Sequence, residues 1–194
     1  VTIFERIGGQ SRRAAEVVRR LRKMVRGGTV QKARHDINQI IRNVLLLFEH
    51  ELNNLDIKIE FDPIQPACEL YVDDIQIQQV LVNLVKNSMD AISDSGQQDG
   101  RVDITVERRK SELEISVEDN GPGLPQHVAD TFTGDPDFGG SSGLGLGVSR
   151  KLASAMGGSL EYERIAGRTS LLLSLPAFEA DESERDAAMV AAEG

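Results

Sequence analysis

The 194-residue chain has one cysteine, no tryptophan and few aromatic residues, which make up 4% of the sequence. A single cysteine, Cys68, excludes an internal disulfide and any cysteine-based zinc cluster. We expect it to be a small buried apolar residue beside a strand. With 40% hydrophobic residues, the core must be built mainly from Leu, Ile, Val and Ala.

Long hydrophobic runs are also missing. No uninterrupted apolar stretch approaches the roughly 20 residues that cross a bilayer, and the first ten residues lack the layout of a signal peptide. We therefore expect a soluble, cytoplasmic segment without direct membrane contact, within a parent protein that could still be membrane-anchored.

The net charge of −9 is unevenly spread. Residues 1–35 carry ten Arg or Lys against two acids, and residues 179–194 carry six acids against one Arg. Such blocks are typical of solvated faces and tails. The basic arm lacks the aromatic or Gly-rich interleaving of nucleic-acid-binding segments, so the sequence does not favour nucleic acid as a partner.

Apolar periodicity divides the chain into three parts. Residues 1–28 contain a narrow seam at alternating threes and fours (Phe4, Ile7, Ser11, Ala14, Val18, Leu21, Val25), which favours a helix from a dimerising bundle over one packed on its own domain. Residues 35–177 form the main domain. Residues 178–194 read as an acidic linker or tail.

Within the main domain the patterns alternate between helix and strand. They predict helices over 36–52, from a cap at Asp73 or Asp74 to about Asp94, and over 147–156. They predict strands over 57–61, around Leu70 and Val72, and over 102–106, 113–117, 160–162 and 171–175. Residues 120–146 form a long Gly-rich loop of the kind that is usually functional. The fold class is therefore α+β: an α/β sandwich, a mixed sheet with helices on one face.

Three short patterns carry candidate chemistry. Asn83, Asn87 and Asp90 present two amides and a carboxylate on one helix face. Asp119 follows a strand and starts Asp-Asn-Gly-Pro-Gly, which is excellent turn chemistry but also offers an acceptor for an exocyclic amine. Residues 139–147 form a Gly-rich run that opens a helix, where free N–H groups suit a polyphosphate. Each pattern alone also has a purely structural explanation.

In this order and at these separations the three patterns together resemble the GHKL ATPase superfamily, and within it the sensor histidine kinases of two-component systems. The resemblance covers about residues 35–176, with residues 73–94, 117–123 and 141–150 similar to the family's N, G1 and G2 boxes and 167–169 to its last motif. It implies a domain that binds ATP and Mg²⁺ and phosphorylates a histidine of a homodimeric partner domain, from which a response regulator takes the phosphate.

The resemblance also implies roles for individual residues. Asn87 would ligate Mg²⁺, and Asn83 would lie one turn earlier, near the phosphates. Asp119 would accept a hydrogen bond from the adenine amine, with Gly121 and Gly123 giving the ring room. The triphosphate and the base would also contact further residues (Ser142, Gly143, Leu144, Gly145, Leu146 around the phosphates; Thr169 near the base).

Some positions depart from the family pattern. Ser141 stands where a glycine is usual, and the lid around residues 131–142 keeps two Phe but lacks a Lys. Asp90 stands where related kinases often have Lys, and we interpret Lys86 as a solvated charge. His35 followed by Asp36 mimics a phosphoacceptor pattern. We reject it because only one helix separates it from the first strand, and we expect the acceptor outside this segment.

Two alternatives stay open. The same motifs occur in serine kinases of the anti-sigma-factor type, although the Arg-rich helix argues against that class. The other is a module that has lost catalysis and only binds nucleotide or dimerises.

Overall fold

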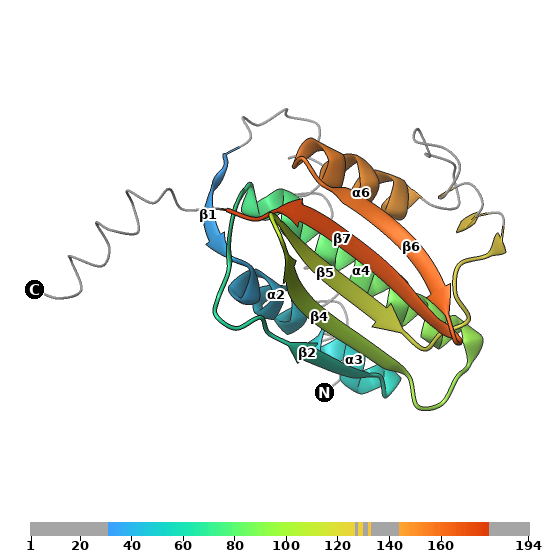
Figure 1. Ribbon diagram of the computed structural model, residues 1–194. Coiled ribbons are helices and arrows are strands. Elements are labelled where there is room, and N and C mark those ends of the chain that lie inside the picture. The colour runs from blue at the N-terminus through green and yellow to red at the C-terminus, as the bar shows by residue number, and fades with distance from the viewer. Residues whose placement is uncertain (1–30, 127, 130–131, 133–143, 179–194) are drawn as a thin grey trace, which may run out of the picture. The chain divides into compact units, whose positions relative to one another are not determined.

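A computed structural model describes residues 31–126, 128–129, 132 and 144–178 (Figure 1). Contacts divide the chain into two units, Val1–Gln31 and Lys32–Gly194. The predicted dimerisation helix, and the acidic tail beyond Phe178, lie outside the described residues.

The second unit is built on a five-stranded sheet with the order β2-β4-β5-β7-β6. Its strands are β2 (Lys58–Asp62), β4 (Arg101–Arg109), β5 (Glu112–Asp119), β6 (Ser159–Ile165) and β7 (Arg168–Pro176). β2 runs parallel to β4, whereas the other neighbours are antiparallel. The predicted mixed sheet is therefore confirmed.

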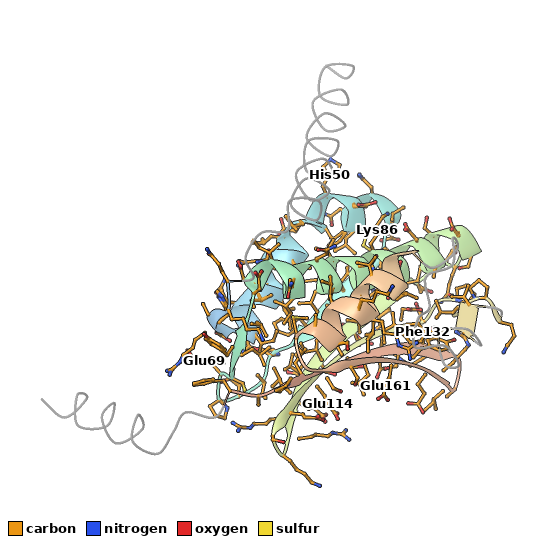
Figure 2. All side chains as sticks on the ribbon, turned by 90° about the horizontal axis from the view of Figure 1, so that it is seen from above. His50, Glu69, Lys86, Glu114, Phe132 and Glu161 are labelled. Atoms are coloured by element: carbon orange, nitrogen blue, oxygen red, sulfur yellow. The ribbon has the colours of Figure 1, made fainter. Side chains whose placement is uncertain are left out.

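Helices cover one face of this sheet, and no other described element covers the opposite face, here called the open face (Figure 1). They are α2 (Ile37–Leu46), α3 (Glu49–Leu55), α4 (Asp74–Ser95) and α6 (Leu144–Ala155). Alternating strand residues such as Val102, Ile115 and Leu173 are buried beneath the helices, because successive side chains of a strand point to opposite faces. Figure 2 shows Lys86 on the helical side and Glu114 and Glu161 on the opposite side.

The central helix α4 begins and ends where the sequence signals place it. The Asp73 carboxylate accepts hydrogen bonds from the backbone N–H groups of Ile75 and Gln76, which satisfies two N-terminal donors of the helix. Gly96 ends it in a left-handed conformation with φ of 66°, which a glycine adopts without steric cost.

Charged residues form a chain of ion pairs across the open face. Arg101 pairs with Glu60 at 2.9 Å and with Asp103 at 2.8 Å. Arg168 pairs with the same Asp103, and with Glu118 at 3.2 Å. These five residues, here called the outer-face ion pairs, join strands β2, β4, β5 and β7.

The predicted helix over residues 36–52 is wrong as one element, because it is divided into α2 and α3. The N–H groups of Leu47 and Phe48 bond to carbonyls three residues earlier, a tighter 3₁₀ pattern that ends the first helix. The apolar run 44–48 concealed this break, and Leu46 and Leu47 are exposed.

The predicted strand around Leu70 is confirmed as β3 (Glu69–Val72), but it does not join the main sheet. It pairs with β1 (Ala33–Asp36), a strand that the sequence patterns did not indicate, in a separate two-stranded sheet. Cys68 is buried immediately before β3, as expected.

Two boundaries near the Gly-rich loop also differ from the prediction. Gln126, Val128, Ala129 and Phe132 are helical, so the segment 120–146 is not uniformly a loop. Helix α6 begins at Leu144 instead of residue 147, so Gly145 and Gly147 lie inside it despite their low helix propensity.

Candidate functional site

Asp119 is the last residue of β5, and its carboxylate is buried on the helical side of the sheet, with 2% of the residue exposed. The backbone N–H of Gly121 donates to its Oδ1 at 2.9 Å. Thr169, also buried, stands directly opposite Asp119 on β7. The structure therefore brings together two residues that the sequence analysis assigned to the base site.

Burial raises the pKa of the Asp119 carboxyl, because the charged form loses its hydration. The Gly121 N–H, the Ser88 and Thr169 hydroxyls and the charge of Arg164 act in the opposite direction and do not cancel the effect. Although it influences Asp119, the Ser88 hydroxyl has no hydrogen-bond partner of normal geometry. The hydrogen bonds within the protein only partly offset the cost of burying this carboxylate, so it is suited to accept a further hydrogen bond from a ligand.

Asn87 precedes Ser88 on α4, and its Nδ2 atom is buried without a hydrogen-bond partner. Buried amide groups without partners are rare in folded proteins. A buried Nδ2 donor without a partner fits a side chain whose hydrogen bonding is completed by a bound group. Its oxygen is the type of ligand that Mg²⁺ accepts.

Asn83 lies one helical turn before Asn87 and connects α4 to α6. Its Nδ2 donates to the hydroxyl of Ser149 at 2.8 Å, and Ser149 is 1% exposed. A Cβ at Gly145 would lie 2.3 Å from Asn83 Oδ1, closer than any real contact. The glycine therefore lets the first turn of α6 approach the amide, and the first N–H groups of that helix form an anion-favouring end.

The glycines after Asp119 allow close packing within the protein itself. A Cβ at Gly121 would lie 3.0 Å from Asp119 Oδ1, and one at Gly123 would lie 2.3 Å from Nη1 of Arg164. Gly123 also has a φ of 85°, which favours glycine on conformational grounds. The space beside Gly123 is thus filled by an arginine that the sequence analysis did not assign to the site.

Among the described residues between β5 and α6, Phe132 is buried, with 2% of the residue exposed. Its ring packs edge-on against Tyr162, with ring centroids 6.4 Å apart. The Arg150 guanidinium lies over the Phe132 ring, with Cζ 5.2 Å from the ring centroid. Arg150 also donates to the Phe132 carbonyl at 2.6 Å. Ser142 and Gly143 lie outside the described residues, Leu144 starts α6, and Leu146 is buried.

Lys86 forms ion pairs with two acidic side chains. Its ammonium group donates to Asp90 at 2.6 Å and to Glu51 at 3.1 Å, so the predicted solvated charge is paired. His35 lies in strand β1, and Asp36 caps α2 by accepting from the Asn38 N–H at 2.9 Å. The His-Asp pair thus belongs to a strand and a helix cap.

Sequence reasoning missed Ser149 and Arg164. Arg164 had a signal: Leu160, Tyr162 and Arg164 alternate along β6, and period two places all three on one face. Ser149 had no comparable signal, because its bond to Asn83 joins residues 66 positions apart. In the described ranges no group of three or more His, Cys, Asp or Glu side chains could hold a metal. No helix in that part is long and apolar enough to span a bilayer.

The sequence and the fold agree on a family. Residues 72–179 match the model of the histidine kinase-, DNA gyrase B- and HSP90-like ATPases. The chain belongs to this family, and it is therefore a nucleotide-using domain of that type.

Curated relatives narrow the comparison to sensor kinases. The chain is 30% identical over 178 residues to the C4-dicarboxylate transport sensor protein DctS of Rhodobacter capsulatus, covering 89% of this chain and 27% of that protein. It is 33% identical over 153 residues to the sensory histidine kinase/phosphatase NtrB of Salmonella typhimurium, covering 72% and 42%. The chain thus spans less than half the length of these relatives.

Solved structures give the same result for the fold. The catalytic domain of the histidine kinase ThkA superposes with a TM-score of 0.66 at 26% identity, covering 75% of this chain and 97% of that one. ThkA in complex with the response regulator protein TrrA gives a TM-score of 0.64 at 26% identity, covering 89% and 49%. The resemblance to the catalytic domain of sensor histidine kinases, predicted from the sequence, is confirmed.

Proposed function

We propose that this chain binds Mg·ATP between α4, the end of β5 and the start of α6, and that it supplies the γ-phosphate to a histidine in two-component signalling. The observation that carries the proposal is the buried Asp119 carboxylate, which faces Ser88 of α4, the residue next to Asn87, whose Nδ2 has no hydrogen-bond partner. The serine-kinase alternative is not favoured, because the similar proteins are sensor histidine kinases.

Each residue has a chemical task in this proposal. The Asp119 carboxylate accepts from the 6-amine of adenine, and the Thr169 hydroxyl lies beside it. The Asn87 oxygen faces the cation, which neutralises phosphate charge when bound. Asn83 holds the first turn of α6 in place, so that its N–H groups point to the phosphates. Leu146 and Gly145 belong to this turn, and Ser142 and Gly143 precede it.

The reaction itself requires positioning more than covalent chemistry by this domain. A ring nitrogen of the acceptor histidine attacks the γ-phosphorus while the bond from that phosphorus to the bridging oxygen breaks, and ADP leaves. An aspartate of a response regulator then takes the phosphoryl group. We propose that the acceptor lies on another segment of a homodimeric full-length protein, which assembles through the helix predicted within residues 1–28.

Calorimetric titration with Mg·ATP tests the proposal. The 194-residue chain should bind the nucleotide, and Asp119→Asn should lose that binding while keeping its helical circular dichroism spectrum. Equal affinity in the two proteins would reject the base assignment. Labelled phosphate appearing on a serine, and not on a histidine, of a supplied upstream domain would support the alternative kinase class.

A further inference from the structure

Arg164 lies close to Asp119, and the nucleotide scheme leaves it without a task. It lies in the edge strand β6, directly opposite Thr169 of β7. The strand alternation that buries Leu160 and half-buries Tyr162 turns Arg164 to the same side. Its neighbour Arg168, by contrast, belongs to the outer-face ion pairs.

One nitrogen of Arg164 connects the two segments that surround Asp119. Nη1 donates to the Gly121 carbonyl at 3.2 Å and to the Thr169 hydroxyl at 2.9 Å. The guanidinium fills the position that a Cβ of residue 123 would need, with Nη1, Cζ and Cδ at 2.3, 3.0 and 3.1 Å from it. This side chain therefore links the turn after β5 to the start of β7, where Asp119 and Thr169 are paired.

Arg164 forms no ion pair within the part of the chain that the structure describes. Its charge instead acts on Asp119, together with the Gly121 N–H and the hydroxyls of Ser88 and Thr169, which face the carboxylate from the β5 turn, α4 and β7. Arg164 is the cation among these groups. Removing it takes away a positive charge that favours the ionised form of Asp119.

We propose, on the basis of the nucleotide function above, that Arg164 is a positioning and specificity residue for the base. It donates to the Gly121 carbonyl and the Thr169 hydroxyl around Asp119, and its charge favours the ionised, accepting form of this carboxylate. An ionised carboxylate accepts from the 6-amino group of adenine and repels the 6-oxo group of hypoxanthine or guanine. Arg164 thereby favours a 6-aminopurine.

The test compares Arg164→Gln, Arg164→Lys and the control Arg168→Gln in the 194-residue chain, with Mg·ATP and Mg·ITP titrated between pH 5 and pH 8. Arg164→Gln should weaken ATP binding about tenfold, the usual size for losing a hydrogen bond from a charged group, and should reduce the preference for ATP over ITP. Arg168→Gln should bind both nucleotides as the unmodified chain does, because it lies on the other face.

The pH profile separates this role from a purely structural one. Loss of the cation favours protonation of Asp119, so the acidic decline of ATP affinity should move to higher pH in Arg164→Gln and stay near its original position in Arg164→Lys. A uniform loss at every pH for both nucleotides, or no loss at all, would overturn the proposal. If the unmodified chain binds no ATP, the proposed function itself fails.

Discussion

Asp119 and Asp103 lie on adjacent strands of the same sheet but face opposite sides, and their surroundings differ sharply. Asp103 is opposite Glu118 and Asp119 is opposite Val102, so the two acids are one register step apart. Asp103 accepts from Arg101 and Arg168. Asp119 is more deeply buried and forms no ion pair within the described residues.

The pKa values of the two carboxyl groups move in opposite directions. Burial opposes ionisation of Asp103, but hydrogen bonds from Arg101 and Arg168 outweigh it and lower its pKa. Burial raises the pKa of Asp119, and its hydrogen bonds do not compensate. The outer acid is satisfied within the fold, whereas the inner acid is held at a cost to stability, which is typical of a functional site.

The largest expected effect concerns the inner side. Asn87→Ala should reduce the Mg²⁺-dependent part of ATP affinity at least about tenfold, the scale on which metal sites respond to lost ligands or their supports. Calorimetry with ATP in magnesium and in excess chelator measures this part. Asn87→Asp keeps an oxygen ligand and serves as the matched variant. A fully retained magnesium effect in Asn87→Ala would rule out a role for this amide.

Asp119→Asn should stabilise the unliganded domain at pH 7 by on the order of 1 kcal/mol. Because the folded-state pKa of Asp119 lies above its unfolded value, the folded state binds the proton more tightly. The free energy of unfolding therefore falls as the pH rises from the unfolded-state pKa through the folded-state pKa of Asp119. Asparagine does not ionise and avoids this loss. Urea unfolding at pH 7 and pH 4 should show a gain that shrinks at the lower pH. A less stable variant at pH 7 would contradict the view that ionised Asp119 destabilises the fold while ionised Asp103 stabilises it.

Gly145→Ala should destabilise the domain by about 1 kcal/mol, in the range for overpacking, because the new methyl group meets the Asn83 amide. The cost should largely disappear in an Asn83→Ala background, where the contact is absent. Urea unfolding of the four proteins forms a double-mutant cycle. Additive effects would show that the two residues do not meet.

The smallest effect belongs to the outer face. Asp103→Asn should lower stability at pH 7 by about 0.5 kcal/mol, since Arg168 is partly exposed and solvent screens the pair. The lowered pKa of Asp103 contributes stability above its unfolded value, and this contribution is lost as the pH falls through the folded value. ATP affinity should stay unchanged. A change in ATP affinity would show that the two faces are coupled.

Local signals in the sequence predicted most of the sheet, and they indicated Asp119 and Thr169, which the structure pairs across β5 and β7. The cap at Asp73, the alternation of β4 and β5, and the turn after Asp119 depend on neighbouring residues, so they could be predicted. Strand β1 could not, because its pairing with β3 joins residues more than 30 positions apart. The break at Leu47 was hidden in a continuous apolar run.

The site itself shows the same division. The sequence motifs indicated Asn83, Asn87, Asp119 and Thr169, and the structure places Thr169 opposite Asp119 and the two Asn residues one turn apart on α4. No motif indicated that Arg164 fills the space beside Gly123, since that contact depends on how β6 aligns with β7. Motifs in the sequence therefore indicated the proposed site residues, whereas the position of Arg164 near Asp119 depends on the register of β6 and β7.

The most direct test is the pKa of the Asp119 carboxyl, measured by carbon-13 NMR in the chain with and without Mg·ATP. The account predicts a value above the usual range for aspartate in the free protein, and a fall when the nucleotide binds, because the adenine amine donates to the ionised form. An ordinary or low value that does not respond to Mg·ATP would contradict the assignment of Asp119 as the acceptor for the base.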